Sequence, residues 1–405
     1  ISLPTGALSS ATTFNILATN TSNGCSYQLT NTATVTISAL PVVTSASTVC
    51  VGSTATLSPT TGGTWLSSNT SIATVTNAGI ITGVAAGSTT FTFTQTSTGC
   101  SSTTSSVTVN AQPTVSITGS TAICVGATTT LSPTTGGTWV SSNAGFASVT
   151  NAGLVTGIAT GAPTFTFTQT STGCSRTTSA VTVNALPVLI APSTMCMGTN
   201  GSLGPITNGT WVSNNTSVAT VTNGGVSTPI TPGSVTFTYT RTSTGCSSTT
   251  PSVTVNAQPT VSISGSSTIC VNQITTLSPT TGGTWASSNT ALATVTNAGL
   301  VTGVSAGSPT FTFTQTSTGC SRTTSAVTIN ALPVVTAPST VCIGTPGTLS
   351  PTTNGTWVSS NTAIATITNA GVVTGVSAGT VTFTYTRTST GCSATTSSVT
   401  VSSNS

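Results

Sequence analysis

A unit of 72 to 74 residues recurs along this chain, and this repeat limits the fold more than any other feature of the sequence. The unit is clearest between Pro41 and Gln112, where Cys50, Trp65 and Cys100 are among its fixed points. A short unit at a fixed period indicates an array of small domains in which each contacts mainly its neighbours. We therefore predict one partial domain and five complete ones: residues 1–40 (the C-terminal strands of a repeat), 41–112, 113–186, 187–258, 259–332 and 333–405.

The arginines show a longer period of two domains. Arg176 and Arg322 are 146 residues apart, and so are Arg241 and Arg387. This spacing indicates duplication of a two-domain block. Because Ile1 falls inside a repeat, we expect the chain to be a piece of a longer protein.

Within each unit, apolar and threonine side chains alternate with a period of two, as in residues 89–94. Such alternation predicts strands with one buried and one exposed face. We expect an all-β fold: tandem immunoglobulin-like seven-stranded β-sandwiches, arranged end to end as an extended rod. In the first complete domain, the predicted strands cover residues 42–49, 54–58, 64–67, 72–76, 80–84, 89–96 and 103–109.

Each complete unit carries one tryptophan on its predicted third strand. A large aromatic side chain at this place in a β-sandwich is expected to fill the core. The alternative is an exposed ring that stacks on sugars. The core prediction covers Trp65, Trp139, Trp211, Trp285 and Trp357.

The composition excludes most catalytic chemistry, because the chain has four arginines and no Lys, Asp, Glu or His. General acids and bases, zinc sites with histidine and carboxylate sites for hard cations have no residues to build them. We expect no enzyme activity, no metal and no cofactor. The dispersed arginines offer no basic patch for nucleic acid, and no run of about 18 apolar residues predicts a membrane span.

Three motifs in the first complete domain carry a family resemblance: residues 65–69 (WLSSN), 72–75 (IATV) and 79–87 (GIITGVAAG). They resemble the bacterial immunoglobulin-like domain of the second group, and they recur in all five complete domains. The match is weakest in the third, where residues 227–230 read STPI. The added VCVG and GC elements resemble repeats of giant surface adhesins exported by gliding bacteria. The resemblance implies a stalk or adhesin without catalytic residues.

The order of the predicted strands favours disulfides between neighbouring domains. Five strands separate Cys50 from Cys100, so an odd number of antiparallel crossings places these two cysteines at opposite ends of a domain. A strand of seven or eight residues is about 25 Å long, whereas a disulfide needs Cα atoms within about 7 Å. The predicted pairs are Cys50–Cys174, Cys124–Cys246, Cys196–Cys320 and Cys270–Cys392, and Cys25, Cys100 and Cys342 have no partner in the chain. Pairing of Cys50 with Cys100 inside one domain stays open if the fourth predicted strand is not a true crossing.

These features favour a mechanical function. Eleven regularly spaced cysteines indicate an oxidising location, so we expect an extracellular protein at the cell surface. The leading hypothesis is a stalk or filament segment of a secreted bacterial adhesin, in which the partners of each repeat are its neighbours. The alternatives are a multivalent carbohydrate-binding array and a filament in which unmatched cysteines link several chains. Sequons such as residues 69–71 permit glycans.

Overall fold

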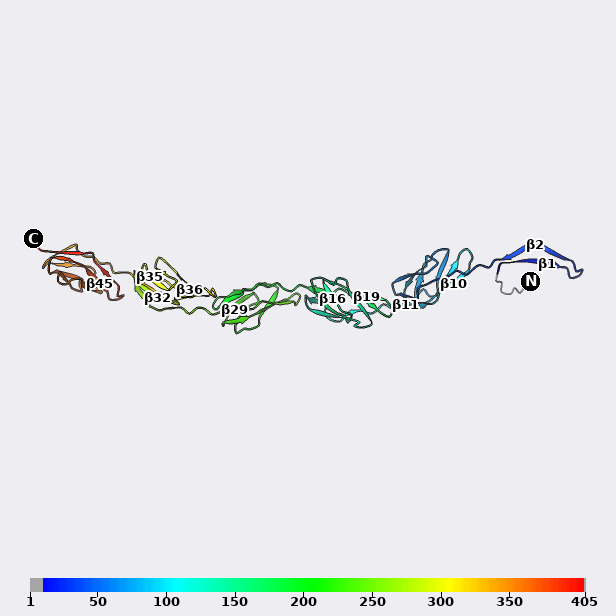
Figure 1. Ribbon diagram of the computed structural model, residues 1–405, viewed down its shortest axis with the longest axis horizontal. Coiled ribbons are helices and arrows are strands. Elements are labelled where there is room, and N and C mark those ends of the chain that lie inside the picture. Colours follow the sequence, from blue (N-terminus) through cyan, green and yellow to red (C-terminus); the bar gives the residue numbers. More distant parts are fainter. Residues whose placement is uncertain (1–9, 404–405) are drawn as a thin grey trace. The chain divides into compact units, whose positions relative to one another are not determined.

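A computed structural model describes residues 10–403, and every regular element in that range is a β-strand (Figure 1). The chain divides into two compact units, Ile1–Leu186 and Pro187–Ser405, each of which is described by itself. The division falls at a predicted domain boundary. We number the five complete domains as repeats one to five from residue 41. The all-β prediction is confirmed, whereas the end-to-end rod stays a prediction.

The first unit opens with an antiparallel hairpin of β1 (Thr12–Thr19) and β2 (Ser26–Val35). Thr12 pairs with Val35 at one end, and Thr19 pairs with Ser26 at the other. The turn that holds Cys25 therefore lies at the end of the hairpin opposite to the segment that leads into repeat one.

Repeat one contains three small sheets of three strands each. Their orders are β10-β9-β5, β4-β7-β6 and β3-β11-β8, and the only parallel strand pair among them is β3 with β11. A parallel bridge between Val51 and Gly83 connects the last two sheets. The strands are β3 (Thr48–Cys50), β4 (Thr54–Thr56), β5 (Gly63–Ser67), β6 (Ala73–Val75), β7 (Ile80–Gly83), β8 (Gly87–Thr89), β9 (Phe91–Gln95), β10 (Ser101–Thr103) and β11 (Val107–Asn110).

The seven predicted strands of repeat one appear as nine, because two predicted strands each change sheets partway. Predicted strand 89–96 is β8 followed by β9, which pair with β11 and β5 respectively. Between them, the amide of Thr90 donates to Ser68 Oγ at 3.0 Å, and its carbonyl accepts from the Ser68 amide at 2.9 Å. Predicted strand 103–109 likewise becomes β10 and β11. Of predicted strand 42–49, only the end lies in β3, and Thr44 makes an isolated bridge to Ser58.

Repeats two and four share a variation that proline explains. Pro163 and Pro309 occupy the position of Thr89, where a ladder amide would be needed. The strand equivalent to β8 is therefore reduced to the bridges Gly161–Val183 and Gly307–Ile329. Repeat two has β12 (Ser116–Ile117), β13 (Ala122–Cys124), β14 (Thr128–Ser132), β15 (Gly137–Ser141), β16 (Ala147–Val149), β17 (Leu154–Gly157), β18 (Phe165–Gln169), β19 (Ser175–Thr177) and β20 (Thr182–Asn184). Repeat four has β30 (Ser262–Ile263), β31 (Thr268–Cys270), β32 (Ile274–Ser278), β33 (Gly283–Ser287), β34 (Ala293–Val295), β35 (Leu300–Gly303), β36 (Phe311–Gln315), β37 (Ser321–Thr323) and β38 (Thr328–Asn330).

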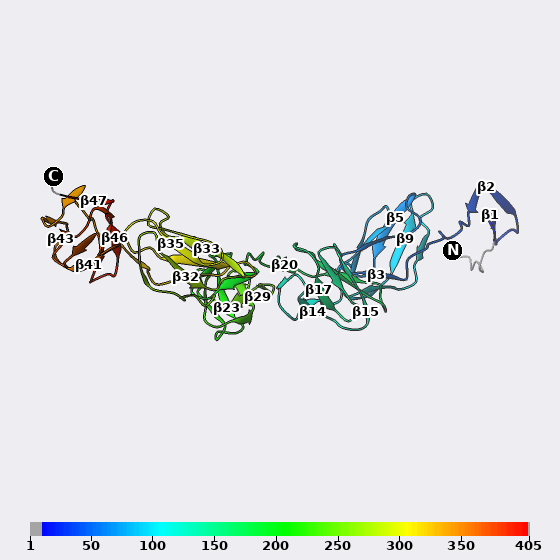
Figure 2. The same ribbon diagram turned by 60° about the vertical axis from the view of Figure 1, so that its left-hand side comes forward.

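Repeats three and five follow the sheet pattern of repeat one. Figure 2 shows β41, β43, β46 and β47 of repeat five gathered in one group. Repeat three has β21 (Thr194–Cys196), β22 (Gly201–Ser202), β23 (Gly209–Ser213), β24 (Ala219–Val221), β25 (Val226–Pro229), β26 (Gly233–Val235), β27 (Phe237–Arg241), β28 (Ser247–Thr249) and β29 (Val253–Asn256). Repeat five has β39 (Thr340–Cys342), β40 (Pro346–Thr348), β41 (Gly355–Ser359), β42 (Ala365–Ile367), β43 (Val372–Gly375), β44 (Gly379–Val381), β45 (Phe383–Arg387), β46 (Ser393–Thr395) and β47 (Val399–Ser402).

Each repeat has its own apolar core, and a tryptophan belongs to every one of them. The tryptophans are only 4–6% exposed, and each ring lies tilted against a Phe or Tyr with centroids 5.0–5.2 Å apart. In every repeat the indole N–H donates to a proline carbonyl at 2.8 Å, as Trp65 does to Pro59. The bond satisfies the one polar group of the side chain, so the ring can be buried at little cost. Rings placed in this way have no free face for a sugar.

The weak motif match in repeat three has a local compensation. Ser227 stands where the other repeats have isoleucine or valine, and it is fully buried. Its hydroxyl contacts the sulfur of Met195 at 3.2 Å, and Met195 is the longest side chain found at its position in the five repeats. The flexible thioether fills the space and partners the hydroxyl.

Paired threonines cover the outer face of the sheet that contains the tryptophan strand. Thr92 and Thr103 share a hydroxyl hydrogen bond of 2.8 Å across β9 and β10, and the equivalent pair in every repeat does so at 2.8–2.9 Å. Cross-strand pairs of this kind stabilise a sheet. They occupy the surface where most proteins place charges.

At Gly209, β23 and β27 lie close together, and this close approach predicts the effect of substituting the glycine. A Cβ at Gly209 would overlap the Tyr239 ring and the Thr240 carbonyl oxygen on β27. We expect Gly209→Ala to destabilise repeat three by about 1–3 kcal/mol, because a packed core accepts added volume poorly. Hydrogen–deuterium exchange of peptides from residues 187–258 measures the loss. The matched control is Gly224→Ala, whose Cβ would meet only Thr222 Oγ1 at 3.8 Å; equal effects of the two substitutions would contradict the prediction.

Candidate functional site

The candidate site is the joint, by which we mean the place where two neighbouring repeats meet. The part of each joint that belongs to the first of the two repeats is a cysteine beside the last strand of that repeat. In repeat one, Cys50 ends β3 and pairs in register with Asn110, which ends β11. The amide of Val51 donates to the Asn110 carbonyl at 3.0 Å, and that of Gly52 donates to the Gly83 carbonyl at 2.8 Å. Gly52 has a φ of 78°, which favours glycine. Cys50 is therefore held at the end where the chain leaves for repeat two.

The C-terminal part of the joint is the turn between β18 and β19 in repeat two. The amide of Gln169 donates to the Cys174 carbonyl at 2.9 Å, and the amide of Gly173 donates back to Gln169 at 2.8 Å. Thr172 Oγ1 accepts from the Cys174 amide and donates to Gln169 Oε1, both at 3.2 Å. These four bonds fix the turn, so Cys174 is presented in one conformation.

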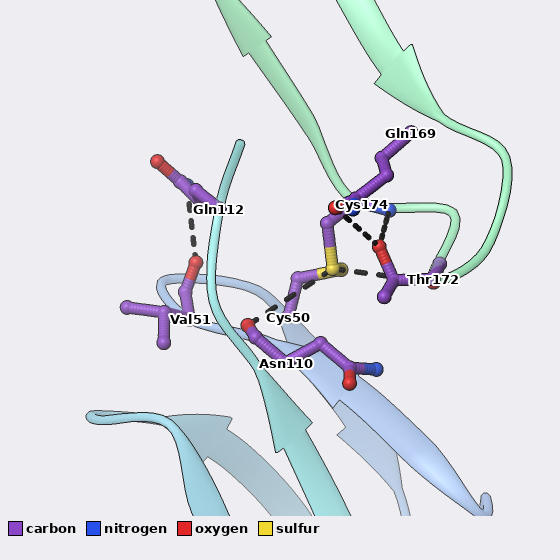
Figure 3. Close-up of a disulfide and its surroundings, with 7 residues drawn as sticks. All are labelled: Cys50, Val51, Asn110, Gln112, Gln169, Thr172 and Cys174. Carbon is purple, nitrogen blue, oxygen red and sulfur yellow. Dashed lines mark hydrogen bonds between the residues drawn. A yellow bond between two sulfur atoms is a disulfide. The ribbon is translucent and has the colours of Figure 1, made fainter. Parts of the chain in front are cut away.

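Figure 3 shows the two parts joined by the Cys50–Cys174 disulfide, with Cα atoms 5.7 Å apart. The Cys174 side chain is fully buried, and its sulfur lies 4.0 Å from the Asn110 and Thr172 carbonyl oxygens. Since a bonded sulfur carries no proton, these are packing contacts. On the linker between the repeats, Gln112 Nε2 donates to the Val51 carbonyl at 3.1 Å.

The second unit contains two further joints of the same kind. Cys196 of repeat three is bonded to Cys320 of repeat four, and Cys270 of repeat four to Cys392 of repeat five. Their Cα distances are 5.5 and 5.6 Å. These bonds and Cys50–Cys174 are three of the four pairs that the sequence predicts, and none joins two cysteines of one repeat.

The remaining cysteines fall into two groups. Cys124 and Cys246 lie in different units, and their predicted pairing stays a prediction. Within residues 10–403, the free cysteines are Cys25, which is exposed, and Cys100 and Cys342, which are half-buried. They are the three for which the sequence predicts no partner in the chain.

Sequence reasoning missed the groove beside the first cysteine of the joint. In repeat three this groove is lined by residues from 190 to 202, and Gly319 and Ser321, the neighbours of Cys320, complete its wall. It encloses about 600 Å³. A signal was present: the octapeptide TQTSTGCS occurs at residues 94–101, 168–175 and 314–321. An identical turn in several repeats indicates a shared contact.

The disulfides at these joints link neighbouring repeats covalently. Among residues 10–403, no group of three or more His, Cys, Asp or Glu side chains could hold a metal ion. No helix in the same range is long and apolar enough to cross a membrane.

Comparison with solved structures returns several multidomain surface proteins. Domains 1–6 of the surface layer protein SbsC share 15% identity, with 87% of this chain and 65% of that chain covered and a TM-score of 0.17. Invasin, a bacterial integrin-binding protein, shares 16% identity over 84% of this chain and 72% of its own, with a TM-score of 0.20. A fragment of intimin in complex with the intimin-binding domain of its translocated receptor shares 16% identity over 44% and 60%, with a TM-score of 0.21. Scores this low carry no argument about function.

No curated protein matches the sequence. A family model does match, twice in succession. The model of the bacterial Ig-like domain (group 2) covers residues 249–326, which include most of repeat four, and residues 343–400 of repeat five. The matched stretches contain the buried tryptophans Trp285 and Trp357 and the cysteines Cys270, Cys320 and Cys392. Residues 249–326 and 343–400 are thus similar, one after the other, to the bacterial Ig-like domain (group 2).

Proposed function

We propose that this chain is a non-catalytic stalk segment of a secreted bacterial cell-surface protein, built to carry tension as an extended rod. The observation that supports the proposal most directly is the set of disulfides between adjacent repeats. Each such joint has two covalent connections, the peptide linker and the sulfur bridge. Two connections restrict rotation at a joint more than one does.

The composition supports the same function. A stalk in an oxidising, extracellular setting can use disulfides where cytosolic proteins cannot. With no carboxylates, the repeats have neither ion pairs nor calcium sites to stiffen their joints. The buried tryptophans favour the stalk over the carbohydrate-binding array, since binding arrays present exposed aromatic rings.

The disulfides also alter the path that tension takes. Pulled from its ends, the chain can transmit force from Cys50 to Cys174 and from Cys196 to Cys320 through sulfur. The force then passes from Cys320 back to Cys270 along the backbone of residues 270–320, and it crosses the Cys270–Cys392 bond. Between Cys50 and Cys392, only residues 174–196 and 270–320 need to bear load, and about 270 residues are bypassed.

Single-molecule pulling of the whole chain tests this proposal. At about 3.4 Å per extended residue, full reduction is expected to lengthen the maximum extension by about 900 Å. A variant with serine at Cys25, Cys100 and Cys342 is the control for bonds between molecules, and it should behave like the unmodified chain. An oxidised chain that extends as far as the reduced one would contradict the proposal.

A further inference from the structure

Two of the four arginines, Arg241 of repeat three and Arg387 of repeat five, occupy the same position in the fold. Each is the last residue of its strand, β27 or β45, and begins the turn that carries Cys246 or Cys392. The chain contains no Asp or Glu, so neither guanidinium has a side-chain carboxylate of its own chain to pair with. A positive charge that the fold leaves without a counterion attracts anions from outside.

The other three repeats have glutamine at this position, and there the glutamine is part of the turn. Arginine has donors only and cannot accept a hydrogen bond. The turn nevertheless keeps its form in repeat five, since the Gly391 amide donates to the Arg387 carbonyl at 2.8 Å, the same distance as in all three glutamine repeats. The turn therefore does not require the arginine. A threonine hydroxyl of the same turn donates at 3.1–3.2 Å to the side-chain oxygens of Gln95, Gln169 and Gln315.

An asparagine lies beside the arginine in the same two repeats. Asn354 directly precedes β41 and has a φ of 64°, and the amide of Thr388, which follows Arg387, donates to its carbonyl at 3.0 Å. Asn208 has the same position and a φ of 66°, whereas repeats one, two and four have glycine there with a φ of 82–83°. Glycine adopts a positive φ freely and asparagine does so less readily. The backbone alone would thus favour glycine, and the asparagine adds an amide side chain next to the arginine.

A tyrosine supports the turn that carries this asparagine. The Tyr385 hydroxyl donates at 2.6 Å to the carbonyl of Thr353, the residue before Asn354, and repeat three has the equivalent bond. The glutamine repeats have phenylalanine, which cannot make it. Repeats one, three and five occupy equivalent places in the two-domain period, yet repeat one has glycine, phenylalanine and glutamine at the three positions. The period therefore does not account for the three residues, which change as a set.

The residues of this set surround a hollow in repeat five, beside the turn that Cys392 ties to repeat four. It is lined by Asn354, Arg387, Thr388 and Ser389 and encloses about 470 Å³. All four side chains can donate hydrogen bonds, and among the residues that the structure describes none of the four has a hydrogen-bond partner for its side chain. Unpaired donors around one positive charge fit an anion, and the volume is that of a small-molecule site.

We propose that the hollow at Arg387, and its equivalent at Arg241, bind anionic sugars of an acidic polysaccharide. The guanidinium pairs with a carboxylate or sulfate of one sugar, and the neighbouring amide and hydroxyl side chains bond to the hydroxyls of the sugar. The wholly polar lining favours a sugar over an acidic peptide, because the hollow offers no apolar side chain to a peptide. A chain without carboxylates repels no polyanion. The inference goes beyond the proposed stalk function and does not depend on it.

Binding of the 405-residue chain to polygalacturonate and to dextran sulfate tests the inference, with dextran as the neutral control. Biolayer interferometry should show binding to at least one acidic polymer, which identifies the anionic group, and none to dextran. Arg241→Gln/Arg387→Gln introduces the residue of the other repeats and should weaken binding at least about tenfold. The matched control is Arg176→Gln/Arg322→Gln, which removes the same charge from exposed positions on β19 and β37 and should weaken binding less than about threefold.

A second variant tests the asparagines at constant charge. Asn208→Gly/Asn354→Gly keeps the net charge at +4 and introduces the glycine that the other repeats have at this positive φ. We expect it to weaken binding at least about threefold, because the amide donor beside the guanidinium is lost. Hydrogen–deuterium exchange of peptides from repeats three and five should show that both stay folded in each variant.

Three results would overturn the inference. Equal weakening by the two pairs of arginine substitutions would mean that the polymer responds to net charge and not to the hollow. Binding to polyglutamate as tight as to the acidic polysaccharides would mean that the hollow does not select a sugar. Failure to bind either acidic polysaccharide would remove the site altogether. The proposed function would stand in each case, since it depends on the disulfides and is tested by pulling.

Discussion

Replacing Trp357 with alanine is expected to unfold repeat five while the other four repeats stay folded. The Trp357 side chain is 5% exposed, packs against Tyr385 with ring centroids 5.2 Å apart, and donates to the Pro351 carbonyl at 2.8 Å. Its removal leaves a large cavity and a carbonyl without its donor, which together cost about 3–5 kcal/mol. A domain of this size has a total stability of only about 4–10 kcal/mol. The expected loss of stability is thus comparable with the whole free energy of unfolding of the repeat.

Hydrogen–deuterium exchange of the whole chain measures this effect repeat by repeat. Peptides from residues 333–403 should lose protection, and peptides from the other repeats serve as internal references. Val358→Ala is the matched control, because Val358 follows Trp357 on β41 but is 63% exposed, so its truncation should change stability by less than about 0.5 kcal/mol. Unchanged protection in the tryptophan variant would mean that the core does not depend on this ring.

The core could be predicted from the sequence because it depends on local alternation. Phe91 and Phe93 are separated by one threonine, so a strand must place both rings on one face, and both are buried. The number of strands could not be predicted in the same way. The break at Thr90 depends on Ser68, a residue far away in the sequence that is brought near only by the fold. The alternation of apolar and threonine side chains continues unchanged where the chain passes from one sheet to another, so the alternation does not indicate the break.

Three of the four cysteine pairs could be predicted because they depend on the direction in which the chain crosses a domain, and not on where each strand begins and ends. Splitting the predicted strand 89–96 into β8 and β9 leaves the chain running in the same direction. The number of times that the chain crosses the domain between Cys50 and Cys100 is therefore still odd. The parallel pairing of β3 with β11 then fixes Cys50 beside Asn110. The repeated turn sequence indicates a contact, but the shape and volume of the groove could not be predicted, since its wall comes from two repeats and its volume depends on how they pack.

Removing the bond between Cys270 and Cys392 is expected to be the second large effect. When repeat five unfolds with repeat four intact, the bond still holds Cys392 near Cys270, so the unfolded segment is a closed loop. Such a constraint lowers the entropy of the unfolded state, and a disulfide typically stabilises the folded state by about 2–4 kcal/mol. We therefore expect Cys270→Ser/Cys392→Ser to destabilise repeat five by about that amount, measured by denaturant titration with exchange of peptides from residues 333–403.

Two controls separate the bond from the loss of the thiols. Cys342→Ser removes a half-buried free thiol from the same repeat and should leave the free energy of unfolding nearly unchanged. Reducing agent should destabilise the unmodified chain as much as the double substitution does, and it should have no effect on repeat five of the double variant. Equal stability of the double variant and the oxidised chain would mean that the Cys270–Cys392 bond does not constrain the unfolded repeat. Repeat five would then be held by its core and linker alone.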